Sequence, residues 1–137
     1  MIKAVIDTNC LLRILPKNSE YRCLWDAFVH GKFEIAYTTE ILHEYEEILS
    51  RFYSVAFTKF AIDAVLNASN AKQITVYYKW QLITADPDDN KFTDCAISAN
   101  AGCIVSNDNH FNVLKDIDFP KINIIDIDTF KEIILTL

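Results

Sequence analysis

The sequence predicts an α/β fold with a mainly parallel central sheet that is covered by helices on both faces. Short apolar runs typical of buried strands alternate along the chain with longer segments that carry apolar residues at helical spacing. Polar residues follow the strand-like runs, as at Asp7-Thr8-Asn9, which is usual at the carboxyl ends of parallel strands. The 137 residues suit one compact domain, so residues 1–137 are expected to share a single core.

The first half of the chain supplies two expected strands and four expected helices. Pro16 ends the first helix, Ser19 offers an N-cap to the second, and Gly31 lies just past the end of the second. Apolar residues from Ile41 to Phe52 recur at helical spacing, which predicts a long helix with one inward face. The expected elements are, in order, a strand at Ile2–Ile6, helices at Asn9–Leu15 and Ser19–His30, a strand at Phe33–Tyr37, and helices at Thr39–Phe52 and Ser54–Ala68.

The second half begins with an apolar run at Ile74–Tyr78 that is consistent with a third strand. Residues 86–90 are rich in turn and N-cap residues, so we expect a loop leading into a helix that ends before Gly102. Thr129 and Glu132 have the spacing of a capping box at the start of a terminal helix. The remaining expected elements are a helix at Lys91–Ala101 and strands at Cys103–Ser106 and Ile122–Ile127.

Composition favours a folded protein without a membrane-spanning segment. Apolar residues make up 51% of the chain, and only two Gly and three Pro are present, which argues against disorder or a linker-rich array. The apolar runs are far shorter than the roughly 20 residues of a membrane-spanning helix, and the N-terminus lacks a secretory signal. We therefore expect no membrane association and residence in the cytoplasm, where the four cysteines, which lack zinc-ligand spacing, stay reduced.

The net charge of −6, from 13 basic and 19 acidic side chains, is unusual for a protein that binds nucleic acid. Nonspecific affinity for phosphates normally comes from Lys and Arg, which release counterions from the nucleic acid. The objection weakens if several acids surround metal ions, because bound cations reverse the local field. The positions of the acids therefore matter more than their number.

Two acids are expected at the carboxyl edge of the sheet. Asp7 follows the first strand directly, and Asp108 follows the strand Cys103–Val105 after Ser106 and Asn107. In open parallel sheets, sites form beyond this edge, so two distant parts of the chain should converge there. The Ser106 hydroxyl could position Asp108 or a bound water. Each acid also has a structural alternative, which is an N-cap for Asp7 and a turn residue for Asp108.

Two further acids lie on expected helices. Glu44 lies roughly 40° from Ile48 on a helical wheel, at the border of the apolar face, but it could also be a surface group with a buried stem. Asp94 lies near the start of its helix, where the helix dipole favours an ionised carboxylate that could hold a cation. Its alternative is compensation of the dipole alone, and its position on the wheel does not show that it faces the same cavity as Asp7.

Asp86, Asp88 and Asp89 form a cluster in the loop before this helix, and at least one of them is expected only to cap it. Asp89 is the reserve candidate for a metal ligand. Carboxylates that face one another raise one another's pKa unless a hard cation neutralises them, and Mg²⁺ or Mn²⁺ suits oxygen ligands best. Such ions activate water and orient a phosphodiester, so hydrolysis needs no nucleophilic side chain.

The order of these motifs resembles the PIN-domain family over nearly the whole chain. The stretch from Asp86 to Asp94 is similar to the branch of that family assigned as toxins of toxin–antitoxin pairs, the VapC-like ribonucleases. The matching motifs are Ile6-Asp7-Thr8-Asn9, Glu44 within Leu42–Leu49, Asp94 within Asp94–Ala101, and Ser106-Asn107-Asp108.

The resemblance implies a three-layer α/β/α domain that cleaves single-stranded RNA with Mg²⁺ or Mn²⁺, often as a homodimer inhibited by an antitoxin encoded beside it. By position it implies four catalytic and metal-binding acids: Asp7, Glu44, Asp94 and, directly or through water, Asp108. Asn9 and Ser106 match the supporting polar positions, with Ser106 standing where Thr is usual. Candidate phosphate contacts, which could equally be solubilising groups, are Arg13, Lys17, Arg22, Arg51 and Lys91.

Other functional classes fit these residues less well. Phosphohydrolases with a nucleophilic Asp after the first strand need a second Asp two residues later, where this chain has Asn9. Phospho-receiver domains need an acidic pair near the first strand and a Lys after a later strand, a place that Lys121 fits poorly. The alternative that stays open is a non-catalytic PIN-like scaffold that binds RNA or a protein partner through the same fold.

Overall fold

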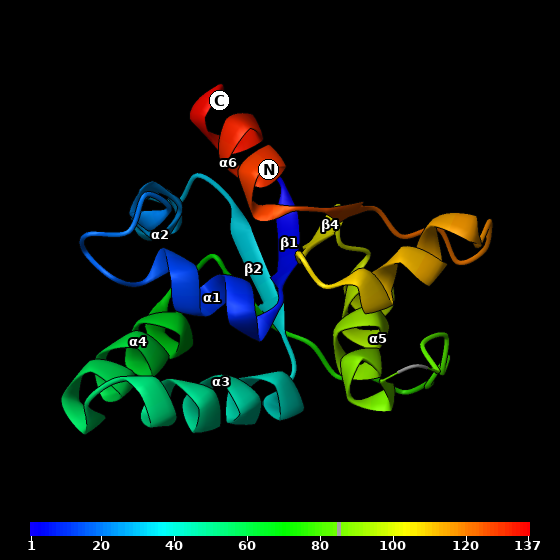
Figure 1. Ribbon diagram of the computed structural model, residues 1–137, viewed down its shortest axis with the longest axis horizontal. Coiled ribbons are helices and arrows are strands. Elements are labelled where there is room, and N and C mark those ends of the chain that lie inside the picture. Colours follow the sequence, from blue (N-terminus) through cyan, green and yellow to red (C-terminus); the bar gives the residue numbers. More distant parts are fainter. Residues whose placement is uncertain (85) are drawn as a thin grey trace.

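The centre of the fold is a five-stranded sheet in which all neighbouring strands are parallel (Figure 1). The computed structural model describes residues 1–84 and 86–137. The strands lie in the spatial order β3-β2-β1-β4-β5. Their bounds are Lys3–Ile6 for β1, Glu34–Tyr37 for β2, Ala71–Gln73 for β3, Cys103–Val105 for β4 and Ile124–Ile125 for β5. The prediction of an α/β fold with a mainly parallel sheet is confirmed.

The strand order reverses between β1 and β4. From β1 the chain moves outward to β2 and β3, and it then returns to place β4 on the other side of β1, with Val5 opposite Ile104. Doubly wound folds place their sites beyond the carboxyl ends of the two strands at such a reversal. The residues that follow these strands, Asp7 and Ser106, are both buried at that point.

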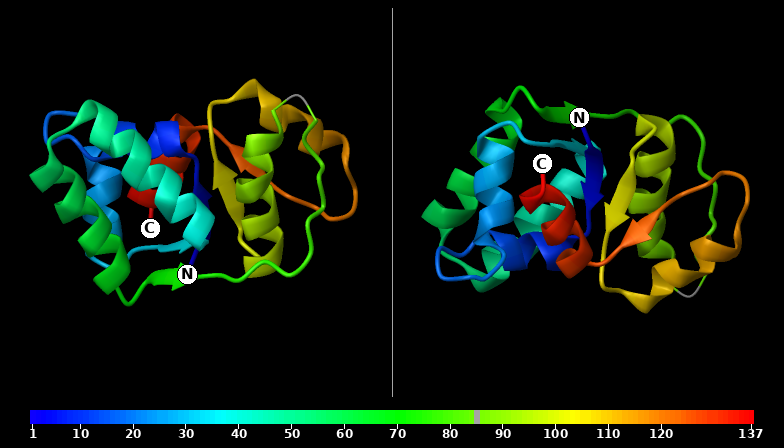
Figure 2. Two further views of the ribbon diagram at one scale, coloured as in Figure 1. Left: turned by 90° about the horizontal axis from the view of Figure 1, so that it is seen from below. Right: turned by 90° about the horizontal axis from the view of Figure 1, so that it is seen from above.

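Helices cover both sides of the sheet. In both Figures 1 and 2, α1 to α4 lie together on one side of the strands, whereas α5 lies on the other side and packs across β2, β1 and β4. The helix bounds are Thr8–Ile14 for α1, Arg22–Val29 for α2, Thr39–Phe52 for α3, Val55–Asn67 for α4, Asn90–Ala99 for α5 and Ile127–Leu135 for α6. Two 3₁₀-helices are described as well, η1 at Pro87–Asp89 and η2 at Asn109–Asp116. No helix in the described ranges is sufficiently long and apolar to cross a membrane.

Buried apolar side chains between Ala4 and Ile134 form one core cluster. A row of aromatic rings joins α2 and the start of β2 to α6, with neighbouring ring centroids 5.4, 5.9 and 5.1 Å apart. The rings of this row belong to Trp25, Phe28, Phe33 and Phe130. Because each of these rings is at most 2% exposed, they fix the C-terminal helix onto the body of the protein.

Two strand predictions were wrong in position. The run Ile74–Tyr78 follows β3 and has no regular structure, and β5 is shorter than the predicted Ile122–Ile127. Ile74 and Val76 are half-buried, whereas the residues beside them are exposed. The alternation of apolar residues that suggested a strand therefore arises because one side of an irregular segment packs on the protein. The segment makes no strand pairing with the sheet.

Helix ends account for the other differences. Helix α2 begins later than Ser19, and η2 was not predicted. Asn100, with φ of 51°, takes the left-handed position at the end of α5, ahead of Gly102. The side chain of Asp126 caps α6 by accepting from the backbone N–H of Thr129 at 2.7 Å, so the predicted capping box starting at Thr129 is wrong.

Candidate functional site

Asp7 is buried at the carboxyl end of β1, with 6% of its surface exposed. The Ser106 hydroxyl, which follows β4, donates to Asp7 Oδ2 at 2.8 Å. The Oγ atom of Ser106 also accepts the backbone N–H of Asp108 at 3.0 Å. Ser106 therefore joins two acids that lie far apart in the sequence, as the convergence of β1 and β4 predicts.

The environment of Asp7 disfavours its negative charge. Burial raises the pKa of Asp7 from 3.8 to about 6, the Ser106 hydrogen bond opposes this rise, and the nearby carboxylates of Asp89 and Asp108 add to it. Like charges held together near a buried carboxylate create a place where a cation would be strongly favoured.

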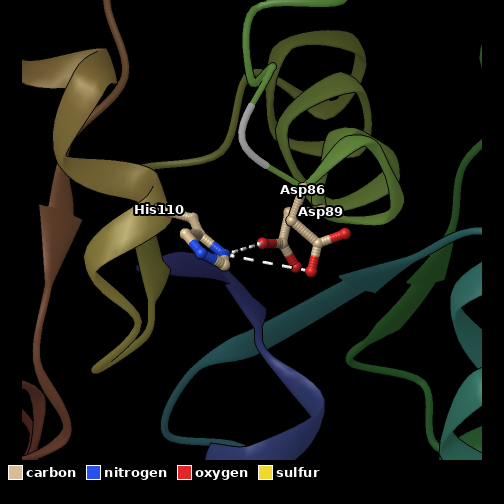
Figure 3. Close-up of side chains that lie close together, drawn as sticks. All are labelled: Asp86, Asp89 and His110. Atoms are coloured by element: carbon tan, nitrogen blue, oxygen red, sulfur yellow. Dashed lines mark hydrogen bonds and ion pairs between the residues drawn. The ribbon is translucent and has the colours of Figure 1, made fainter.

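A second group of possible ligand atoms comes from Asp86, Asp89 and His110, of which Asp89 raises the pKa of Asp7 (Figure 3). His110 Nδ1 lies 3.1 Å from Asp89 Oδ2, 3.3 Å from Asp108 Oδ1 and 3.9 Å from Asp86 Oδ2. Within residues 1–84 and 86–137, Asp86, Asp89 and His110 are the only three candidate ligands whose atoms all lie within 4.8 Å of one another. Ligands on opposite sides of one Mg²⁺ ion lie about 4 Å apart, so this spacing suits a divalent ion.

The same cluster shifts the titration of its members. Burial raises the pKa of Asp89, while its hydrogen bond with His110 lowers it and the charges of Asp86 and Asp108 raise it. The pKa of His110 is raised chiefly by the hydrogen bond to Asp89, with further contributions from Asp108 and Asp86. In the absence of a metal ion, a protonated His110 is therefore the cation that these acids stabilise.

Glu44 on α3 contacts one residue of α1 and one residue of α5. Its carboxylate accepts from the hydroxyl of Thr8, the residue after Asp7, and pairs with Lys91 Nζ at 2.8 Å. The buried Tyr45 hydroxyl donates to the carbonyl of Ile6 at the end of β1, which anchors α3 beside the site. Lys91 thus neutralises Glu44 in the metal-free protein.

Asp94 has different surroundings. Its carboxylate is buried, but it accepts the backbone N–H of Trp80 at 3.0 Å. Burial raises the pKa of Asp94, the Trp80 hydrogen bond and Lys79 lower it, and Glu40 raises it. Asp94 lines two hollows of about 500 and 240 Å³ together with Glu40, Lys79 and Lys91. Its role as a metal ligand stays a prediction, whereas Asp89, the reserve candidate, acts on Asp7 directly.

The other predicted site residues lie mostly outside this cluster. Asn9 is exposed on α1. The cationic group of Arg13 lies 4.8 Å from the centre of the Tyr21 ring, and Lys17 is exposed. Surface ion pairs join Arg22 to Asp26 and Arg51 to Glu47. Of the five candidate phosphate contacts, only Lys91 forms an ion pair with a candidate site residue, Glu44, among the described residues.

Two partners in this cluster were missed by the sequence reasoning. His110 lies two residues after Asp108, on the unpredicted helix η2. The available signal in the sequence was a second possible metal ligand at this spacing from Asp108. Asp86 was considered only as a turn residue, and its side chain does accept the N–H of Asp88 at 3.2 Å. A turn role and a place in a ligand cluster are compatible, because a carboxylate has two oxygens.

Comparisons with known proteins identify a family for most of the chain. Residues 3–110 match the family model described as PIN domain. No curated protein matches the chain significantly. The crystal structure of VapBC2 from Rickettsia felis bound to a DNA fragment from their promoter matches with a TM-score of 0.62 and 18% identity, over 91% of this chain and 98% of that one. PAE2754 from Pyrobaculum aerophilum also matches with a TM-score of 0.62, at 13% identity over 99% of this chain and 91% of that one. At such identities these two likenesses show the fold alone.

Proposed function

Because the chain belongs to the PIN domain family, we propose that it is a metal-dependent endoribonuclease, acting in the cytoplasm, that hydrolyses phosphodiester bonds of single-stranded RNA. The observation that supports this most directly is the group of acids around Asp7. Asp7, Asp89 and Asp108 come from three distant elements and interact at the reversal of strand order. A buried carboxylate with raised pKa in such a place is characteristic of functional sites.

The donor set fits a hard divalent cation. Asp7, Asp89 and Asp108 would move together to hold the ion, because among the described residues only the ligand atoms of Asp86, Asp89 and His110 already lie within 4.8 Å of one another. His110 would add a nitrogen ligand, and Glu44 would join when it leaves Lys91. Mg²⁺ or Mn²⁺ bound there would supply an activated water and neutralise charge on the phosphodiester. Asp94, which the family pattern suggests as a ligand, is the alternative to Asp89, and the two assignments are separable by substitution.

The surrounding residues have positioning roles in this proposal. Ser106 orients the carboxylate of Asp7 and the backbone of Asp108 through one hydroxyl. Thr8 orients Glu44. Lys91, once displaced from Glu44, would be free to contact a phosphate of the substrate.

We further propose that the protein is a VapC-like toxin of a toxin–antitoxin pair, and that it forms a homodimer and binds a cognate antitoxin. The fold shared with the VapBC2 structure supports this assignment, as does the motif from Asp86 to Asp94. Purification of the chain together with the product of the adjacent reading frame tests it. A stable complex that suppresses RNA cleavage is expected, and failure of the two chains to associate would reject the pairing.

The ribonuclease proposal is tested with end-labelled single-stranded RNA, with and without Mn²⁺ or Mg²⁺. Cleavage is expected only with the metal ion, and Asp7→Asn should abolish it while the circular dichroism spectrum stays unchanged. If the folded Asp7→Asn variant cleaves like the wild type, the mechanism is wrong. If the wild type binds RNA but never cleaves it, the scaffold alternative takes its place.

A further inference from the structure

A row of three aromatic side chains, two exposed and the central one half-buried, lies on the segment before α5 and the loop after η2. Tyr78, Trp80 and Phe119 form this aromatic row, with ring centroids 4.8 Å apart between the first two and 6.1 Å apart between the last two. Tyr78 is 64% exposed and Phe119 is 82% exposed, and the rings meet at 70° and 78°, edge to face. Single exposed apolar residues are common, but a contiguous group of aromatic rings is a feature of binding surfaces.

The aromatic row is fixed in position by α5. The backbone N–H of Trp80 donates to the buried Asp94 carboxylate at 3.0 Å. The side chain of Asn90 pairs with both the N–H and the carbonyl of Ile83, each at 2.9 Å. Ile83 itself is 1% exposed. These contacts hold an otherwise irregular segment against the helix, so the rings are presented on a defined surface.

The same segment leads towards the candidate metal centre. Lys79, next to Trp80, lines the hollow of about 500 Å³ with Asp94 and Lys91. Lys91 in turn pairs with Glu44 of the site at 2.8 Å. The segment that carries the aromatic row is therefore connected through Lys79 and Lys91 to Glu44 of the candidate site.

We propose that the aromatic row binds the bases of single-stranded RNA by stacking, an inference that rests on the ribonuclease function proposed above. Bases of a single strand have free faces, and stacking on aromatic side chains supplies affinity with little sequence preference. Lys79, between Tyr78 and Trp80 in the sequence, lines the adjacent hollow, where its cation would contact the backbone of a strand that continues from the row. A strand bound there would extend along the hollow to the phosphodiester cut at the metal centre.

The charge of the protein makes stacking the main available source of affinity. The net charge is −6, and five of the 13 Lys and Arg side chains are paired with acids. The paired basic residues are Arg22, Arg51, Lys59, Lys72 and Lys91. Binding through Lys and Arg alone would be weak and steeply dependent on salt, whereas stacking depends on salt far less.

The test measures binding to the full-length chain in EDTA, where no divalent ion supports cleavage. The probes are a fluorescein-labelled oligoadenylate of about 12 nucleotides and an abasic oligomer with the same number of phosphates. Trp80 fluorescence gives a second readout, because the other tryptophan, Trp25, is only 2% exposed and should not respond. Quenching by oligoadenylate, and a slope of log Kd against log salt with a magnitude below about 2, are expected for one or two phosphate contacts.

Matched variants separate stacking from other effects. Tyr78→Ala and Phe119→Ala should each weaken oligoadenylate binding by about fivefold or more and leave the weak binding of the abasic oligomer unchanged. Phe52→Ala is the control, because Phe52 is a 68% exposed aromatic residue at the end of α3. Equal binding of the two oligomers, or equal losses for Phe52→Ala and Phe119→Ala, would overturn the inference. Conversion of a dimer to a monomer by Tyr78→Ala in sedimentation would also overturn it, because the row would then be a contact between two copies.

Failure of this inference and failure of the ribonuclease proposal give different results. If the protein cleaves RNA with Mn²⁺ but the aromatic variants cleave limiting RNA at the wild-type rate, only the aromatic row is misassigned. If oligoadenylate binds through the row but no metal ion supports cleavage, only the nuclease activity is rejected.

Discussion

Replacing Asp7 by Asn should abolish activity and, in the metal-free protein, make the fold more stable. Asp7 is 6% exposed, and its pKa rises from 3.8 to about 6, chiefly through burial. A carboxylate with a raised folded-state pKa destabilises the fold when it is ionised. This destabilisation is absent below pH of about 4, grows as the pH rises towards 6, and is complete above that value.

The magnitude follows from the size of the pKa rise. At about 1.4 kcal/mol for each pKa unit, the rise from 3.8 to about 6 corresponds to roughly 3 kcal/mol at pH 7.5. Asn can still accept the Ser106 hydrogen bond, and the Asp7 side chain makes no capping hydrogen bond to α1 that could be lost, so little is lost with the charge. The variant also loses a favourable charge at a helix N-terminus, so we expect a net gain of about 1–3 kcal/mol.

Urea unfolding in EDTA at pH 7.5 and pH 4 measures this effect. The difference between Asp7→Asn and wild type should be large at pH 7.5 and small at pH 4. Asp118→Asn removes the same charge from an exposed position and serves as the control. Added Mn²⁺ should stabilise the wild type more than the variant, because the ion binds the folded state. The reasoning is refuted if Asp7→Asn is no more stable than wild type at pH 7.5 in EDTA.

Three further predictions concern the metal ligands. Asp89→Asn should weaken Mn²⁺ binding, measured by calorimetry, by about tenfold or more. Asp94→Asn should change Mn²⁺ binding by less than about twofold and instead loosen the segment around Trp80, which lowers the tryptophan fluorescence anisotropy. If Asp94→Asn weakens Mn²⁺ binding more than Asp89→Asn does, Asp94 is the ligand. His110→Gln should weaken Mn²⁺ binding by about tenfold but Mg²⁺ binding much less, because an imidazole nitrogen suits Mn²⁺ better than Mg²⁺. Equal losses of affinity for the two ions would exclude His110 as a ligand. Lys91→Gln should tighten Mn²⁺ binding by about two- to tenfold, since it frees Glu44 and removes a nearby positive charge, and weaker binding would show that Lys91 supports the site.

Elements with a strong apolar period were predictable from the sequence. Helix α3 begins and ends where the spacing from Thr39 to Phe52 places it, with the Thr38 hydroxyl accepting the N–H of Ile41. The convergence of Asp7 with Ser106 and Asp108 was also predictable, because parallel strands share one carboxyl edge. These features depend on the apolar spacing within one helix or on the shared direction of the strands in a parallel sheet.

The rest of the site depends on irregular segments, which periodicity does not describe. Asp94 is nearly fully buried, and its carboxylate accepts the backbone N–H of Trp80 because the segment after β3 packs against α5. A helical wheel describes one helix alone and cannot predict this contact. Asp89 lies near enough to raise the pKa of Asp7 because η1 adds a tight turn ahead of α5. His110 joins the cluster through η2, a 3₁₀-helix that begins directly after Asp108, whose side chain accepts the backbone N–H of His110 at 2.9 Å. Sequence reasoning therefore found the acids but not which of them face one another.

The position of a bound metal ion tests the central claim most directly. A crystal of the wild-type chain soaked in Mn²⁺ and measured at the manganese absorption edge shows the ion by its anomalous signal. We expect one strong site in contact with the carboxylates of Asp7, Asp89 and Asp108. Manganese found only at the protein surface, or bound without Asp7, would contradict the assignment of this cluster as the catalytic centre.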